Sequence, residues 1–222
     1  MKTITFYYDP ISPYAYLAFE ALPKALLGLS YAVAYKPVFL GAILVSHGQL
    51  APAEIAPKRD WTYRQVLWQA KQLCIQFQMP AMHPFMPLPL LRLAAAASDE
   101  QGFTNRFVTG QIFNHVWQGG LDANDAERLA ALTERLAHKI TAGVNSTSDA
   151  AKTRLKTNTD DAIKDGCFGV PSFVVGEGLD KKVFWGLDSL PMLREYLEGN
   201  AWFDSNAGWD SVAKIGVGFK RP

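Results

Sequence analysis

The sequence predicts an α/β protein in which two halves of one sheet are separated by a helical insertion. Three observations support this class. The first 38 residues have a β-α-β pattern, residues from about 41 to 165 have helical periodicity, and two short strand-like runs over 172–185 precede a last helix. The hydrophobic share of 49% and the charged share of 19% are typical of a globular chain with a substantial core.

The N-terminal segment alternates between strand and helix signals. Residues 3–8 are rich in β-branched and aromatic side chains and predict a strand. Ser12 and Pro13 then favour a helix start, because serine is a good N-cap and proline suits the first helical position. Pro23 is expected to kink or end this helix, and a second strand follows over 30–38.

Apolar spacing predicts a block of helices in the middle of the chain, over 60–78, 90–98, 103–117, 125–140 and 150–164. In the first of these, Val66, Ala70 and Cys74 recur on one face, so Cys74 is expected in an inert core. After the block, residues 172–175 and 182–185 predict a hairpin, and a helix over 190–197 ends at Gly199.

Composition excludes several classes of function. The 22 Lys+Arg and 21 Asp+Glu leave a net charge of +1, so neither a nucleic acid nor a membrane surface is expected as a partner. No apolar run approaches the roughly 20 residues of a spanning helix, and no signal-type stretch opens the chain. Cys74 and Cys167 form no CxxC pair and no disulfide framework, so a reducing, cytoplasmic setting is expected. The four histidines lack metal-ligand spacing, so no metal site is expected.

Ser12 is the first candidate for chemistry. It follows a strand and caps a helix, where backbone N–H groups and the positive helix end favour an anion or a thiolate. The alternative is that Ser12 serves only as an N-cap.

Two later segments are candidates as well. Pro171 lies between a helix and a strand, where a cis bond would expose the preceding backbone to a ligand; a trans proline that starts an edge strand is the alternative. Asp188 joins a strand to the last helix, beside N–H groups that accept anions; a plain cap is the alternative. Cys167 follows a helix end, where the dipole disfavours a thiolate.

Taken in order, these segments resemble the 2-hydroxychromene-2-carboxylate isomerase and kappa-class glutathione transferase family. The motifs that carry the resemblance are D-P-I-S-P-Y-A-Y-L-A at 9–18, F-G-V-P-S-F at 168–173 and F-W-G-L-D at 184–188. The resemblance spans about 3–197 and implies a thioredoxin fold with a large DsbA-like all-helical insertion. It implies a discontinuous thioredoxin-like domain of 1–40 and 160–200, a helical insertion domain of 41–159, and a C-terminal tail of 201–222.

The resemblance also implies a glutathione site. Where redox relatives have CxxC, this chain has Ser-Pro-Tyr-Ala, which cannot exchange dithiols. Ser12 would act as the catalytic residue by donating a hydrogen bond to the glutathione thiolate. The other implied glutathione-binding residues are Gln49, Lys58, Val170 before a cis Pro171, and Leu187 with Asp188 at the γ-glutamyl end.

The chain departs from the family pattern at several places, and one is the first inserted helix, where Gln65 and Trp68 replace the common Asp and Arg. Leu187 stands where the isomerases usually have asparagine, Leu44 where they have a substrate-contacting lysine, and His-Pro-Phe-Met at 83–86 where F-P-x-N is expected. Glutathione handling is therefore better supported than the isomerase substrate.

The implied activity is a glutathione-dependent isomerisation in which the bound thiolate adds reversibly to a small aromatic substrate, the ring opens, a bond rotates and glutathione leaves. The alternatives are a kappa-class transferase that conjugates electrophiles, and a non-catalytic thioredoxin-fold binding protein. A homodimer is predicted, as the family often forms one and as aromatic residues lie in the tail at Trp202, Phe203, Trp209 and Phe219.

Overall fold

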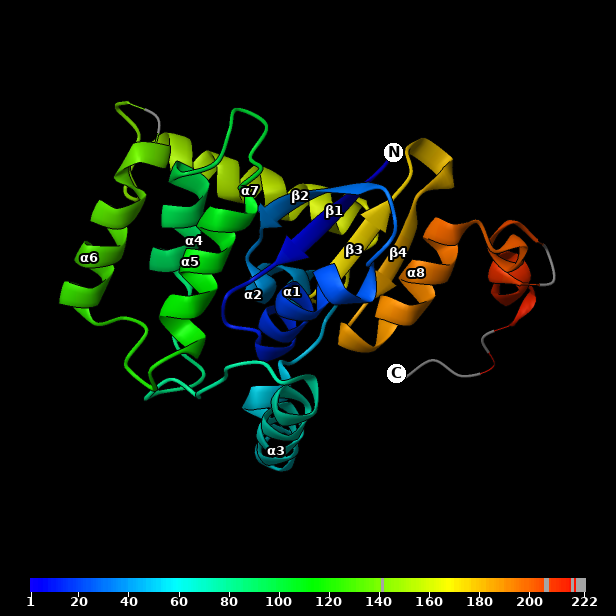
Figure 1. Cartoon of the computed structure of the whole chain (residues 1–222), viewed down its shortest axis with the longest axis horizontal. Coiled ribbons are helices and arrows are strands. Elements are labelled where there is room, and N and C mark those ends of the chain that lie inside the picture. Colours follow the sequence, from blue (N-terminus) through cyan, green and yellow to red (C-terminus); the bar gives the residue numbers. More distant parts are fainter. Residues whose placement is uncertain (141, 206–207, 217, 219–222) are drawn as a thin grey trace.

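The computed structural model of the chain describes residues 1–140, 142–205, 208–216 and 218, and one mixed sheet lies at its centre (Figure 1). Its strands are β1 (Lys2–Tyr8), β2 (Tyr31–Pro37), β3 (Ser172–Val175) and β4 (Lys182–Trp185), in the order β2-β1-β3-β4. β1 pairs parallel to β2 and antiparallel to β3, with Phe6 opposite Phe173. Strands from the two ends of the chain therefore share one sheet, and the predicted fold class is confirmed.

Helices cover both faces of this sheet. The two that lie in front of it in Figure 1 are α1 (Pro13–Ala25) and α8 (Leu190–Glu198), and α7 (Asp149–Lys164) runs behind it. Because β-strand side chains alternate, Phe6 and Phe184 pack in the larger core on the α1 side, whereas Tyr7 packs with Val174 and Ala162 on the α7 side.

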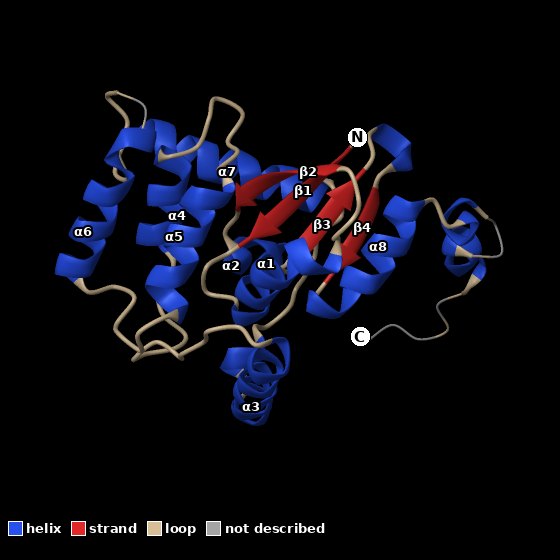
Figure 2. Cartoon of the chain, in the orientation of Figure 1, coloured by secondary structure: helices blue, strands red, loops and turns tan. Residues whose placement is uncertain are grey.

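The remaining helices extend from one end of the sheet and below it (Figure 2): α2 (Leu40–Ser46), α3 (Ala56–Leu73), α4 (Leu88–Ala96), α5 (Arg106–Trp117) and α6 (Ala126–Leu136). Their core is continuous with that of the sheet, since the ring of Phe113 lies 5.2 Å from Tyr8 and 5.2 Å from Phe19. α7 runs across the predicted boundary at 159/160, and the division into domains stays a prediction.

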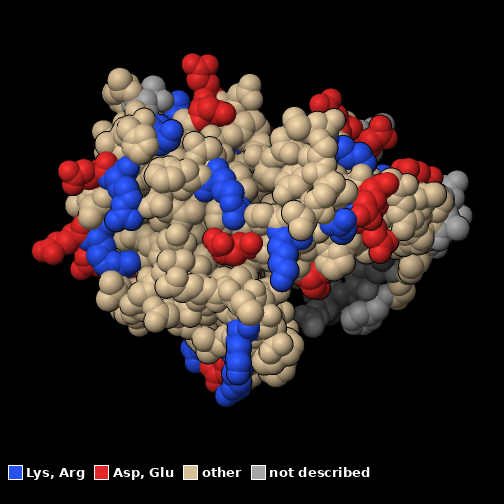
Figure 3. Space-filling model, in the orientation of Figure 1, with Lys and Arg blue, Asp and Glu red and all other residues tan. Residues whose placement is uncertain are grey.

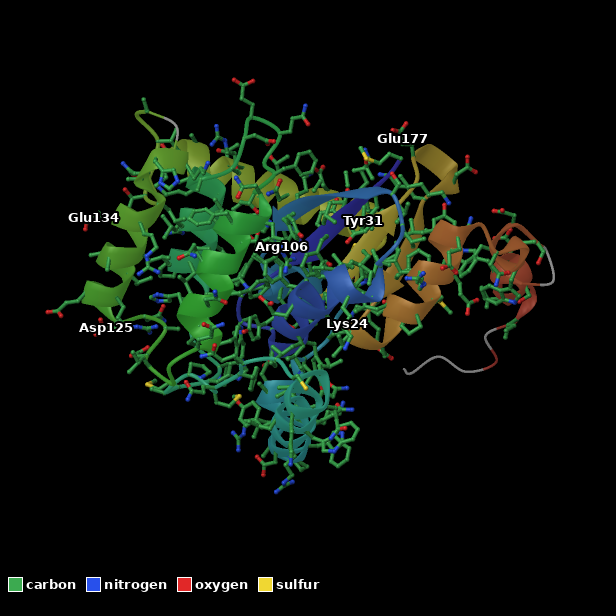
Figure 4. All side chains as sticks on the ribbon, viewed as in Figure 1. Lys24, Tyr31, Arg106, Asp125, Glu134 and Glu177 are labelled. Carbon is green, nitrogen blue, oxygen red and sulfur yellow. The ribbon has the colours of Figure 1, made fainter. Side chains whose placement is uncertain are left out.

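Arg106 links the insertion to the thioredoxin-like part (Figure 4). Its guanidinium group donates hydrogen bonds to the Phe19 carbonyl at 3.1 Å and the Tyr35 hydroxyl at 3.3 Å. It also lies 4.1 Å from the Phe19 ring centroid, within the range of a cation–π interaction. One side chain at the start of α5 therefore fixes that helix against both α1 and β2.

The predicted bounds of the helix over 60–78 are wrong at both ends, and the prediction that Cys74 is buried is wrong as well. α3 begins earlier, at Ala56, and it ends at Leu73 because Cys74 adopts the left-handed conformation at φ 55°. Cys74 is exposed as a result. Phe77 does belong to the core, but it reaches the ring of Trp117, 5.3 Å away, from an extended segment.

Two further expectations change. Pro23 does not end α1, which continues to Ala25. In the tail, Phe203 is 2% exposed, and its ring packs against Phe184 and Trp209 of the same chain. Part of the aromatic cluster is thus explained within one chain, whereas Phe219 lies outside the described residues.

Three features of the described residues relate to the partners considered from the sequence: the distribution of charge, the apolar character of the helices, and the grouping of side chains that bind metals. On the face drawn in Figure 3, acidic and basic side chains are interspersed. Among the described helices, none combines the length and apolar character needed to cross a membrane. Within the described part of the chain, no three His, Cys, Asp or Glu side chains gather as a potential metal site.

Candidate functional site

A cavity of about 970 Å³ lies where the sheet end meets α1, α2 and α3. It is lined by the β1–α1 loop, by segments leading into α3 and α4, and by the turns on either side of the β3–β4 hairpin. All seven residues that the sequence predicts for the site line it: Ser12, Gln49, Lys58, Val170, Pro171, Leu187 and Asp188. The cavity has the volume of a site for a cofactor or a small ligand.

Ser12 lies at the N-terminus of α1 and is 6% exposed. Its Oγ accepts a hydrogen bond from the Ala15 amide at 3.2 Å, so the capping alternative is part of the structure. Its hydroxyl proton points to the Val170 carbonyl at a long 3.4 Å. Because that bond is weak, a thiolate in the cavity could replace the Val170 carbonyl as acceptor of the Ser12 hydrogen bond at little cost.

The segment around Pro171 lies directly opposite Ser12. The Val170–Pro171 peptide bond is cis, so the alternative of a trans proline is wrong. The Pro171 carbonyl accepts the Gly186 amide at 2.9 Å, which ties this turn to the one after β4. The Val170 backbone is left at the cavity edge, where it can pair with an extended peptide.

Leu187 and Asp188 follow β4 in a short 3₁₀ turn. Gly186 has φ 92°, and a Cβ there would lie 2.4 Å from Asp188 Oδ1, so only glycine fits. The capping alternative for Asp188 is wrong, because Ser189 occupies the N-cap of α8. The exposed Asp188 carboxylate has no hydrogen-bond or ion-pair partner within the described part of the chain, which leaves it open to a cationic group of a ligand.

Gln49 and Lys58 reach the cavity from other segments, the connection between α2 and α3 and the first turn of α3. Both side chains are exposed. The Lys58 ammonium group forms no ion pair with another described residue, and it lines the same cavity as the acidic Asp188. The cavity lining therefore includes the basic Lys58, the acidic Asp188 and Glu54, and Ser12.

Asp9 is a site residue that the sequence reasoning missed. It is fully buried, and its carboxylate accepts the Ile11 amide at 3.0 Å and the Leu40 amide at 2.9 Å. Burial raises the pKa of Asp9 to about 7, although the two amides lower it. Its backbone carbonyl also accepts the Ser12 amide, so Asp9 fixes the Ser12 loop against the start of α2.

Tyr63 and His83 form a second group that was missed. His83 Nε2 lies 2.8 Å from the Ile11 carbonyl, and its Nδ1 lies 2.8 Å from the Tyr63 hydroxyl. Burial lowers the pKa of His83, and the Ile11 contact opposes that shift. The sequence did contain a sign that this residue is special, because His83 is the first residue of the 83–86 segment that departs from the family pattern.

The two thiols do not contribute to the cavity. Cys167 is buried, and burial raises its pKa to about 12. Cys74 ends α3 and is not among the lining residues. Any thiol chemistry in the cavity therefore depends on a ligand that carries its own sulfur.

This chain belongs to the DsbA-like thioredoxin domain family, whose model matches residues 3–198. Two similar proteins indicate which kinds of enzyme within this family the chain resembles. It is 28% identical over 201 residues to the 2-hydroxychromene-2-carboxylate isomerase of Sphingobium xenophagum, covering 88% of this chain and 98% of that protein. It is 25% identical over 206 residues to the glutathione S-transferase kappa 2 of Caenorhabditis elegans, covering 88% and 92%.

A solved structure of a 2-hydroxychromene-2-carboxylate isomerase has the same fold, with a TM-score of 0.71, 24% identity and coverage of 88% and 94%. The family predicted from the sequence motifs is thereby confirmed. The prediction of an enzyme is confirmed too, because both kinds of relative are enzymes and match over most of the chain.

Proposed function

We propose that the protein is a glutathione-dependent isomerase of the 2-hydroxychromene-2-carboxylate isomerase type. The observation that carries the proposal is the meeting of Ser12, Val170 and Asp188 around one cavity that no cysteine lines. A thioredoxin-type site without its own thiol suits a bound thiol cofactor.

Each wall of the cavity suits one part of glutathione. The Ser12 hydroxyl and the N-terminus of α1 stabilise the thiolate. The Val170 backbone pairs with the cysteinyl residue, and Asp188 beside Leu187 binds the γ-glutamyl ammonium group. Lys58 and Gln49 bind the carboxylate at the glycyl end.

The substrate is a small aromatic molecule. The aromatic side chains of Trp61 and Tyr63 on α3 line the cavity together with Ser12, as does His83 from the segment before α4. The ring of 2-hydroxychromene-2-carboxylate opens to an α,β-unsaturated ketone, and the bound thiolate adds to its electron-poor β-carbon, with the electron pair passing to the ketone oxygen. A bond then rotates, and expulsion of the thiolate regenerates glutathione.

A kappa-class transferase is the second candidate, favoured by the 25% identity to a kappa transferase. The same thiolate would then be joined permanently to an electrophile. A non-catalytic glutathione-binding protein is the third outcome of the test. In each case glutathione must be reduced, which suits a cytoplasmic setting and the two free cysteines.

The deciding experiment follows glutathione during turnover. The protein is mixed with 2-hydroxychromene-2-carboxylate and a substoichiometric amount of glutathione, and product and free thiol are both measured. An isomerase converts many equivalents of substrate and leaves the thiol unchanged. Loss of one thiol per product indicates a transferase, and glutathione binding without any product indicates a binding protein.

A further inference from the structure

The Tyr63 hydroxyl has two acceptors for a single proton. It lies 2.7 Å from the His83 carbonyl and 2.8 Å from His83 Nδ1. When His83 is neutral with its proton on Nε2, it donates to the Ile11 carbonyl, and Tyr63 donates to Nδ1. When His83 is cationic, Nδ1 donates to the Tyr63 oxygen, and Tyr63 donates to the His83 carbonyl.

Both protonation states therefore give a partner to each ring nitrogen of His83 and to the Tyr63 hydroxyl. A change of protonation therefore leaves neither ring nitrogen of this partly buried histidine without a partner. The pair can accept and release one proton with only a rotation of the Tyr63 O–H bond.

The surroundings keep the pair ready to accept a proton. His83 packs against the uncharged rings of Phe85 and Trp117. Burial lowers its pKa, so that the neutral form prevails near neutral pH. Burial raises the pKa of Tyr63 and is the largest effect on it. Two charged residues of the same helix act as well: Arg59 lowers the pKa of Tyr63, and Asp60 raises it.

The pair lies on the same cavity wall as the proposed substrate site. Tyr63 and His83 both line the cavity with Ser12, and His83 donates to the carbonyl of Ile11, the residue before Ser12. A substrate attacked by a thiolate at Ser12 would thus occupy the cavity that this pair lines.

We propose that Tyr63 and His83 are the proton shuttle of the isomerisation. This inference rests on the proposed function. In the substrate, one carbon carries both a hydroxyl group and the ring oxygen. The hydroxyl proton passes to the Tyr63 oxygen while the Tyr63 proton passes to His83 Nδ1.

The electrons and protons then balance within one cycle. As the hydroxyl loses its proton, its oxygen forms a C=O bond, the bond from that carbon to the ring oxygen breaks, and the electron pair stays on the ring oxygen as a phenolate. The reverse transfer through Tyr63 delivers the stored proton to the phenolate. The pair ends the cycle as it began, and no oxidant or reductant is needed.

The test compares two reactions of the glutathione-loaded protein. Isomerisation of 2-hydroxychromene-2-carboxylate needs the shuttle, whereas conjugation of glutathione to 1-chloro-2,4-dinitrobenzene expels chloride and needs no proton transfer after the thiolate forms. The variants are Tyr63→Phe and His83→Gln, which keeps a donor for Ile11 but cannot store a proton. Tyr14→Phe is the matched control, because it removes another hydroxyl from the cavity wall.

The shuttle predicts that both variants lower kcat/KM for isomerisation about 100-fold relative to conjugation, and that Tyr14→Phe leaves the ratio of the two reactions as in wild type. It also predicts a fall of wild-type isomerisation at acidic pH, as His83 becomes cationic, that His83→Gln lacks. Equal effects on both reactions, or no effect on isomerisation, would overturn the shuttle alone. A wild-type protein that conjugates but does not isomerise refutes the isomerase and the shuttle together.

Discussion

The Ser12 hydroxyl group makes two hydrogen bonds: it accepts one from the Ala15 amide and donates one to the Val170 carbonyl. A bound peptide that pairs with Val170 and a bound thiolate that accepts from Ser12 would replace the longer of these contacts. The residue can therefore serve as helix cap and as thiolate donor without changing its conformation.

Asp9 makes a pH-dependent contribution to stability. Its pKa is raised from 3.8 to about 7 by burial. The folded state then holds this proton more tightly than the unfolded state, so the contribution is fully present below pH 4 and is lost as pH rises through about 7. Each tenfold change in proton affinity is worth about 1.4 kcal/mol.

We expect the free energy of unfolding of the wild type to fall by a few kcal/mol between about pH 4 and pH 7 on account of Asp9. Asp9→Asn removes this titration, so its unfolding free energy should fall less over the same range. Urea unfolding of both proteins across that range measures the two slopes. Parallel curves would show that Asp9 does not titrate there.

Local sequence predicts some residues of the site and not others. Ser12, Pro171 and Asp188 each lie at an element boundary that a short motif marks. Tyr63 and His83 lack such a mark, because their pairing depends on how the segment before α4 folds back on α3. Asp9 stands in a predicted motif, but only the distant Leu40 amide reveals its buried carboxylate.

At the scale of elements, the order of strands and helices follows from periodicity, while some ends depend on tertiary contacts. α3 ends at Leu73 because Phe77 packs on Trp117 and the chain must turn to reach it. α8 ends where predicted, since Gly199 provides a left-handed cap without outside help.

The tail is an element whose packing the sequence could not specify. Phe203 is 2% exposed and Trp202 is 45% exposed, although they are neighbours. We expect Phe203→Ala to lower the free energy of unfolding by about 3–5 kcal/mol, because it leaves a cavity beside Phe184.

Trp202→Ala is the matched control, and it should cost no more than about 1 kcal/mol. Denaturant unfolding of the two variants gives the comparison. If the two variants are equally stable, the tail does not pack against the sheet as described.

At the scale of the whole molecule, the core runs from the sheet into the helical insertion through Phe113 and Trp117. This continuity places α3 and the segment before α4 over the N-terminus of α1, which builds the cavity. The segments that build this cavity lie far apart in the sequence. The family resemblance predicted that they meet at one site, whereas composition alone could not predict it.

We predict a homodimer. The tail no longer supports this by itself, since Phe203 is covered within the chain, but α3 exposes Trp61 at 63% and Trp68 at 62%. Exposed aromatic side chains on one helix are typical of an interface. Light scattering at micromolar concentration should give twice the mass of the chain, and a monomer would contradict the prediction.

The central claim is that Ser12 stabilises the thiolate of bound glutathione. A hydrogen bond to a charged group contributes about 1.5–3 kcal/mol, and its loss in Ser12→Ala should therefore raise the pKa of the bound thiol by roughly one to two. The variant also loses a helix cap, at a cost of about 1 kcal/mol in stability. Ser12→Thr keeps a hydroxyl and serves as the control.

Ultraviolet titration of the thiolate in the glutathione complexes of the wild type, Ser12→Ala and Ser12→Thr makes the measurement. Binding of glutathione by all three proteins is established first. The account predicts a higher thiol pKa in Ser12→Ala than in the other two. Identical titration curves in the wild type and Ser12→Ala would contradict it, and Ser12 would then be a helix cap alone.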